Sequence, residues 1–169
     1  MKKQILILMA LMIATTVQIH CQVQRSFFGC TLGESSLIDA EVALSMRGYK
    51  YYYDTEEIDD NIVIRHIEHA GVVFDKVTFL FEDLEGKMNE ALFVKQYGSF
   101  SSASAAQEKL VRVIKAGCDI AYEKVFIKDL PTFWFSDDDV TCSIGLLKHF
   151  PNGYTLAVMY EYDERYKQY

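Results

Sequence analysis

The sequence predicts an α+β domain made of two tandem repeats, each a helix followed by antiparallel strands, in one sheet or two abutting sheets with both helices on one face. Three observations support this. Two segments align without a gap at an offset of 69 residues. In each segment apolar residues recur at helical spacing up to a glycine and at every second position after it. A hairpin turn signal then follows at a matching place in both halves.

The aligned segments begin at Phe28 (FGCTLGESSLIDAEVALSMRGYKYYYD) and at Tyr97 (YGSFSSASAAQEKLVRVIKAGCDIAYE). Each runs 19 positions from its first glycine to the glycine after the helical stretch, Gly48 or Gly117. The chain after its N-terminal segment is therefore expected to form one domain, residues 22–169. The matching glycines divide this domain into two pseudo-repeats, at about 27–97 and 98–169.

Helices are expected near 36–47 and 102–116, where apolar residues recur at helical spacing. Gly48 and Gly117 are the expected C′ residues, because glycine adopts the left-handed backbone without strain. Serines offer the N-caps, Ser35 or Ser36 in the first unit and Ser101 or Ser102 in the second.

Strands are expected wherever apolar and polar residues alternate after each helix. The turn signals are Asp83–Lys87 and Pro151–Gly153, the latter with the Asn-Gly pair that favours a tight hairpin. The expected strands lie near 49–54, 61–68, 71–82, 88–97, 119–127, 131–136, 140–150 and 154–163.

The N-terminus has the pattern of a secretory signal peptide, assigned to residues 1–21. Lys2 and Lys3 precede an apolar stretch from Ile5 to Ala14 that is too short to span a bilayer. Cleavage after Cys21 would start the mature chain at Gln22, and cleavage near Thr16 is the alternative. The pattern predicts a protein that is secreted or resides in the periplasm, in a bacterial cell envelope.

Cys21 raises a second interpretation, a lipidated cysteine of a bacterial lipoprotein. The positions three and one before it are Gln18 and His20, whereas a lipobox has an aliphatic residue and a small residue there. A membrane attachment is expected only if Cys21 carries lipid.

Charge excludes one class of partner. After residue 21 the chain has 15 basic and 24 acidic residues, a net charge of −9. A nucleic-acid partner is not expected, since phosphate backbones require a basic surface. Cys30, Cys118 and Cys142 are an odd number for a disulfide framework and are interpreted first as small buried apolar residues, with one bridge plus a free thiol as the alternative.

The stretch FFGCTLGESSLIDAEVALSMRGY has the form aromatic-Gly-x-x-Leu-Gly-x-Ser leading into a helix that ends in glycine. It resembles the opening of many small envelope and secreted bacterial proteins. The tandem plan is similar to the β-lactamase-inhibitor-protein fold, and one unit is similar to outer-membrane assembly lipoproteins of the SmpA/OmlA type. The recognisable residues run from Phe27 to Tyr53. The resemblance implies a binding scaffold, not a reaction.

No motif marks an enzyme, a cofactor or a metal. His66 and His69 lie three apart, which on a strand directs their side chains to opposite faces. The acidic runs at 54–60 and 137–139 lack the glycine and spacing of a calcium loop. Nucleophile elbows, zinc-protease motifs and phosphate-binding glycine loops are absent from the sequence. We therefore expect a non-enzymatic protein with no catalytic, cofactor-binding or metal-binding residues.

Aromatic residues in the strands are the candidate contacts. The stretch YKYYYD places Tyr51 and Tyr53 on one strand face, where we expect packing, and Tyr52 on the other, where we expect contact with a partner. The candidate binding residues are Tyr52, Trp134, Tyr160 and Tyr162.

The expected function is an extracytoplasmic binding or inhibitor-like module that presents a sheet face to a protein or extended polymer ligand. The alternative is an envelope assembly or structural accessory protein, lipid-anchored if Cys21 is modified.

Overall fold

The computed structural model of the protein describes residues 23–54, 61–81, 86–117, 122–137, 139–149 and 153–162. The expected signal peptide, the cysteines at 21 and 118, most of the first hairpin turn and residues 151 and 152 of the second lie outside these ranges.

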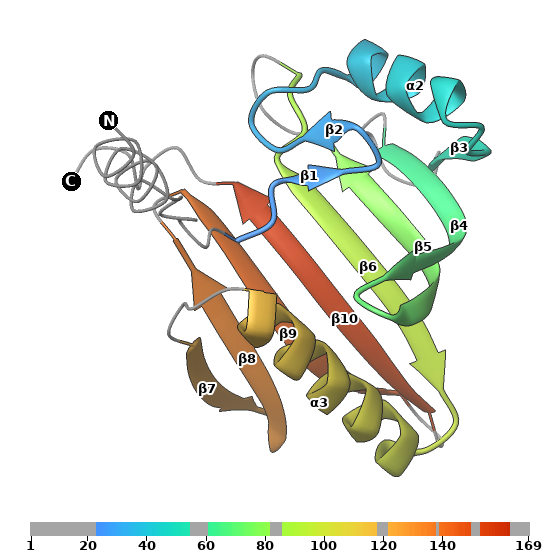
Figure 1. Ribbon diagram of the computed structural model, residues 1–169. Coiled ribbons are helices and arrows are strands. Elements are labelled where there is room, and N and C mark those ends of the chain that lie inside the picture. Colours follow the sequence, from blue (N-terminus) through green and yellow to red (C-terminus); the bar gives the residue numbers. More distant parts are fainter. Residues whose placement is uncertain are drawn as a thin grey trace, which may run out of the picture.

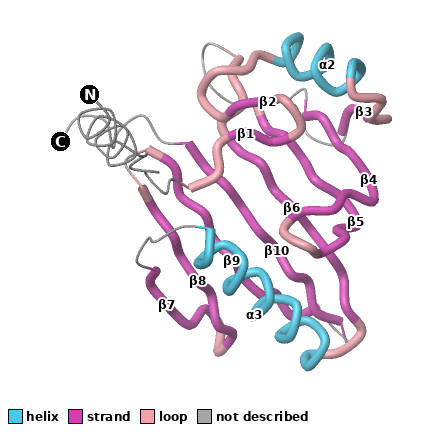
Figure 2. Tube along the Cα trace, viewed as in Figure 1, coloured by secondary structure: helices cyan, strands magenta, loops and turns pink. Residues whose placement is uncertain are grey.

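One antiparallel sheet of eight strands dominates the described structure (Figure 2), in the spatial order β3-β4-β5-β6-β10-β9-β8-β7. Each expected strand is confirmed within the described residues, with bounds that differ by at most about three residues, because the period of two is a local signal. The expected strand residues 82, 119–121, 150 and 163 lie outside the described ranges. The strands are β3 (Tyr51–Asp54), β4 (Asn61–His69), β5 (Val72–Leu80), β6 (Glu90–Tyr97), β7 (Tyr122–Ile127), β8 (Leu130–Ser136), β9 (Val140–His149) and β10 (Gly153–Tyr162). A small separate hairpin pairs β1 (Ser26–Phe27) with β2 (Cys30–Thr31).

Helix α2 (Leu37–Met46) begins and ends as its sequence predicts. Ser36 is the N-cap: its Oγ accepts a hydrogen bond from the Asp39 amide, and the Asp39 carboxylate accepts one from the Ser36 amide. This reciprocal pair satisfies two backbone donors at the start of the helix. Beyond its end, Gly48 has a φ of +75°, which suits glycine.

Helix α3 (Phe100–Gly117) begins earlier than expected. The side chain of Ser99, and not that of Ser101 or Ser102, accepts a hydrogen bond at the N-terminus, from the Ser102 amide at 3.3 Å. Gly117 is the last residue of the helix and has no positive φ, so its expected left-handed C′ role is wrong.

The predicted fold class is wrong. Of the described residues, 57% are in strands and 23% in helices, so the protein is mostly β. The architecture is a single eight-stranded antiparallel sheet rather than two helix-plus-strand repeats with both helices on one face. Figure 1 shows the difference: α3 lies on the sheet and runs along β9 and β10, whereas α2 lies beyond the strand ends, beside β2. The physical reason is that α2 is too apolar all round to define one packing face, and Ile38, Val42 and Met46 remain exposed.

The hydrophobic core lies between the sheet and the elements on one of its sides, here called the covered face. Helix α3 packs there through Ala103 and Leu110. The β1–β2 hairpin packs there through Phe27, whose ring lies 5.6 Å from that of Phe93. Cys30 and Cys142 are buried in this core as free thiols, which confirms their expected burial. No helix within the described ranges is long and apolar enough to cross a membrane.

The tyrosines of β3 differ from expectation. Tyr53 is 42% exposed and Tyr52 is 38% exposed, so the expected burial of Tyr53 is wrong. Strand β3 is a four-residue strand at the edge of the sheet, so Tyr53 has a neighbouring strand on one side only. Tyr51 is partly buried and its ring packs edge-on against that of Tyr53, with centroids 6.1 Å apart.

Candidate binding face

The second side of the sheet, here called the open face, has no helix or further strand over it among the described residues. The side chains on an antiparallel sheet that stand directly opposite one another across the strands share a face. The pairing register therefore gives the residues of this face row by row.

The central row crosses all eight strands. Tyr52 stands at one end on β3, and Trp134 stands near the other end on β8. Between them the row is apolar or carries small hydroxyl groups, with Leu92 and Met159 half-buried at its middle. In strand order the central row is Tyr52, Val63, Thr78, Leu92, Met159, Ser143, Trp134 and Glu123.

A second row runs beside it and is made mainly of small side chains on the middle strands. Gly145 lies opposite both Ala157 and Thr132, and a Cβ at Gly145 would lie 3.3 Å from the Thr132 hydroxyl. Such a row lets the backbone of a partner approach the sheet closely. In strand order the second row is Arg65, Lys76, Val94, Ala157, Gly145, Thr132 and Val125.

Two hollows flank these rows and differ in charge. The first, of about 390 Å³, is lined by two basic residues, Arg65 and Lys76, and one acidic residue, Asp75. The second, of about 290 Å³, is bordered by Trp134 and by two acidic residues, Glu123 and Asp137. The open face is therefore more basic towards β4 and β5 and more acidic towards β7 and β8.

The Tyr52 ring is held in place from one side. The guanidinium carbon of Arg65 lies 5.2 Å from the centre of that ring, a cation–π arrangement. This contact orients an exposed aromatic side chain at the end of the central row, which lowers the entropy that the side chain would lose on binding a partner.

The structure places two of the four candidate binding residues on the open face, far apart. Tyr52 and Trp134 both lie in the central row, six strands apart, which corresponds to roughly 30 Å. Tyr160 and Tyr162 lie on the covered face instead. Tyr160 is only 1% exposed, and the Tyr162 ring packs over Gly33.

The histidines do not form a metal pair. His66 is exposed with a φ of +54°, while His69 is buried at the end of β4. No group of three or more potential ligands that could hold a metal ion occurs in the part of the chain that the structure describes.

Leu92, Met159, Arg65 and Lys76 are open-face residues that sequence reasoning missed. Alternation within a strand predicts which residues share a side of that strand, and this signal was available. It does not give the register between strands or the order of strands in the sheet, and both are needed to assemble a row.

Comparison with known proteins adds no relative: no protein-family model, curated protein or solved structure matches this chain.

Proposed function

We propose that the protein is a non-enzymatic binding module, working outside the cytoplasm, that holds a protein partner against its open face. The observation that carries the proposal is the central row, a continuous line of side chains with no helix or further strand of the described residues over it. Val63 and Thr78 within the row are buried, whereas the held Tyr52 stands exposed on β3 and Trp134 stands half-buried on β8. Tyrosine, tryptophan and arginine are the residues most enriched among those that dominate interface energies.

The size of the face favours a protein over a small ligand. The two rows and the residues beside them cover roughly 30 by 20 Å, or about 600 Å², from strand and residue spacings. This approaches the area of about 800 Å² that one partner contributes to a standard protein interface. The charge gradient predicts the orientation, with acidic partner residues near Arg65 and Lys76 and basic ones near Glu123.

The N-terminal pattern supports the placement outside the cytoplasm, since a charged start and a short apolar stretch are typical of secretory signals. The resemblance of residues 27–53 to secreted and envelope proteins points to the same compartment and to a binding role.

Site-specific photo-crosslinking tests this function. A photoreactive phenylalanine analogue is placed at Met159 on the open face or at Ile38, an exposed apolar position on α2. Irradiation in secreted and envelope fractions of the source cells is expected to give a discrete adduct from position 159 and not from 38. Trp134→Ala and Lys76→Glu should each weaken that adduct at least tenfold.

Two results would overturn the proposal. One is an adduct of equal yield from both positions. The other is an adduct from position 159 that neither Trp134→Ala nor Lys76→Glu diminishes while both variants remain folded by circular dichroism.

A further inference from the structure

A cavity of about 350 Å³ lies on the covered side of the sheet, away from the open face. The last turns of α3 form one wall through Val113, Ile114 and Gly117, and Ala70 of the β4–β5 turn lies near them. The N-terminal segment contributes Gln24, and the sheet contributes His69 and Tyr160. The cavity has the size and the apolar lining of small-ligand sites.

Two polar side chains from distant parts of the sequence meet in the wall of this cavity. The Nε2 atom of His69 and the hydroxyl of Tyr160 are joined by a hydrogen bond of 2.8 Å. Their side chains are almost entirely buried. Small-ligand sites are mostly apolar with a few placed polar groups that orient the ligand, and this pair supplies such groups here.

Aromatic rings fix the imidazole of His69. It stacks on Phe93 with centroids 4.4 Å apart and an interplanar angle of 23°. Phe27 packs edge-on at 5.9 Å, and the Tyr160 ring does so at 5.5 Å. The hydrogen-bonding edge of the ring is therefore held in one orientation, which spares a ligand the cost of ordering it.

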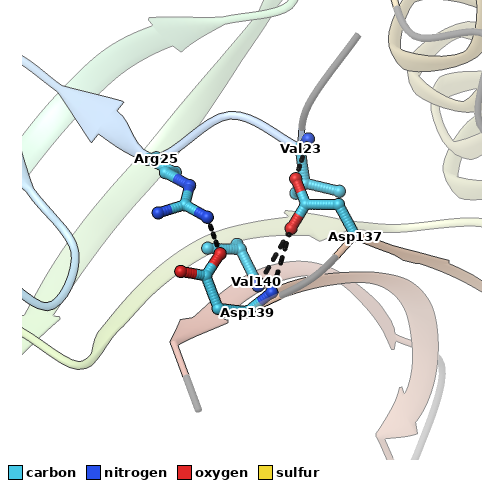
Figure 3. Close-up of polar contacts among 5 residues, drawn as sticks. All are labelled: Val23, Arg25, Asp137, Asp139 and Val140. Atoms are coloured by element: carbon cyan, nitrogen blue, oxygen red, sulfur yellow. Dashed lines mark hydrogen bonds and ion pairs between the residues drawn. The ribbon is translucent and has the colours of Figure 1, made fainter. Parts of the chain in front are cut away.

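The N-terminal segment that carries Gln24 is fixed on both sides of this residue. Figure 3 shows that the Asp137 carboxylate accepts a hydrogen bond from the Val23 amide and that Arg25 forms an ion pair with Asp139. The side-chain Nε2 of Gln24 donates a hydrogen bond to the Ser26 backbone carbonyl at 2.9 Å. The wall is thus part of the folded structure and is anchored to the β8–β9 connection.

The lining defines the chemistry of the ligand. No aspartate, glutamate, lysine or arginine is among the described residues that line the cavity. Burial also lowers the pKa of His69 to about 4, so its imidazole is neutral at neutral pH. The described lining therefore offers an ion no side chain of opposite charge, although the cavity is partly open to solvent.

We propose that this cavity binds a small, uncharged and mostly apolar molecule that carries one hydrogen-bonding group, with that group directed at the His69–Tyr160 pair. The volume has room for about a dozen waters, and so for a ligand with a similar number of non-hydrogen atoms. The site stands apart from the proposed protein-binding function and does not depend on it.

Indole and indene are matched probes, since they have nearly the same shape and only indole carries an N–H donor. Calorimetric titration of the whole protein at pH 7 is expected to show saturable 1:1 binding of indole, about tenfold tighter than that of indene. Indole-3-acetate, which adds a carboxylate, should bind at least tenfold more weakly than indole.

Three variants locate the site. Val113→Trp fills the cavity from a half-exposed helix position and should weaken both probes at least tenfold. His69→Phe keeps the ring and should reduce indole to the affinity of indene while leaving indene unchanged. Val73→Trp, a similarly exposed position outside the lining, is the control and should change neither affinity.

The proposal is overturned by the absence of saturable binding of both probes up to millimolar concentration. It is also overturned by Val113→Trp binding indole as the unmodified protein does, or by indole-3-acetate binding as tightly as indole. If His69→Phe folds poorly, Tyr160→Phe replaces it in the comparison of indole with indene, with the same expected loss of discrimination.

Discussion

At the residue scale, His69 makes the stability of the protein depend on pH. Burial lowers its pKa to about 4 from an ordinary value of 6.5, so the unfolded chain binds a proton more readily than the folded one. The contribution of His69 is complete above pH 6.5 and is lost as the pH falls towards 4, by an amount of roughly 3 kcal/mol.

Urea titrations between pH 7 and pH 4 measure this dependence. In His69→Phe the free energy of unfolding should fall less steeply over that window, even if the variant is less stable at pH 7 because Tyr160 loses its partner. Identical pH slopes in the two proteins would show that His69 is protonated as easily in the folded state as in the unfolded one.

A second residue-scale prediction compares two glycines with nearly the same backbone. Gly33 and Gly48 have φ values of +74° and +75°, so alanine at either is strained by roughly 1–2 kcal/mol. At Gly48 a Cβ meets nothing within 4 Å, whereas at Gly33 it would lie 2.5 Å from the Tyr162 ring. Gly33→Ala should therefore cost about 1–3 kcal/mol more than Gly48→Ala in chemical denaturation.

The double variant Gly33→Ala with Tyr162→Ala separates the clash from the strain. Removing the ring should recover the part of the loss that exceeds the Gly48→Ala value, giving a favourable coupling energy in the double-mutant cycle. Additive losses would mean that Tyr162 does not press on Gly33.

At the scale of elements, Asp137 joins the N-terminal segment to the β8–β9 connection. Its carboxylate accepts hydrogen bonds from the Val23 amide at 2.6 Å and the Val140 amide at 3.0 Å. Asp137→Ala should lower the free energy of unfolding by about 2–3 kcal/mol, since hydrogen bonds to a charged group contribute more than neutral ones. Asp75→Ala is the matched control, because Asp75 is exposed and its one described hydrogen bond is from the Gln96 amide, so under about 1 kcal/mol is expected. Equal losses in urea titrations would contradict the proposed junction.

The element scale is also where the sequence was most informative. Strand positions follow from alternation, and the Ser36–Asp39 cap and Gly48 follow from local chemistry within a few residues. The failure concerned what α2 packs against, because Ile38, Val42 and Met46 point to solvent although their residue types suggest a core. Burial of that kind depends on tertiary contacts, which the local pattern does not contain.

At the scale of the whole molecule, the candidate site is again predictable from sequence within a single strand but not across the strands of the sheet. Alternation within strands selects Tyr52 and Trp134, which lie on the open face, but it also selects Tyr160, which is buried on the covered face. Residues of one strand can be sorted onto two sides from sequence. Which side faces the core across eight strands depends on register and on the position of α3, and both arise only on folding.

The last prediction concerns the cooperativity of the whole molecule. Cys30 on β2 and Cys142 on β9 are fully buried, and burial raises the pKa of the Cys30 thiol to about 11. Neither thiol should react with a labelling reagent until the chain opens. Although β1–β2 is a two-stranded hairpin of its own, Phe27 contacts Phe93 and Phe28 contacts Phe79, so the hairpin cannot leave without exposing the core of the main sheet.

In a variant with Cys21 and Cys118 replaced by serine, the thiols of Cys30 and Cys142 should therefore be labelled through the same global opening, with the same dependence of rate on urea. Mass spectrometry of the peptides reports the two rates separately. Faster labelling of Cys30 with little dependence on urea would show that the hairpin opens independently, and the single core inferred from these aromatic contacts would then be two units of unequal stability.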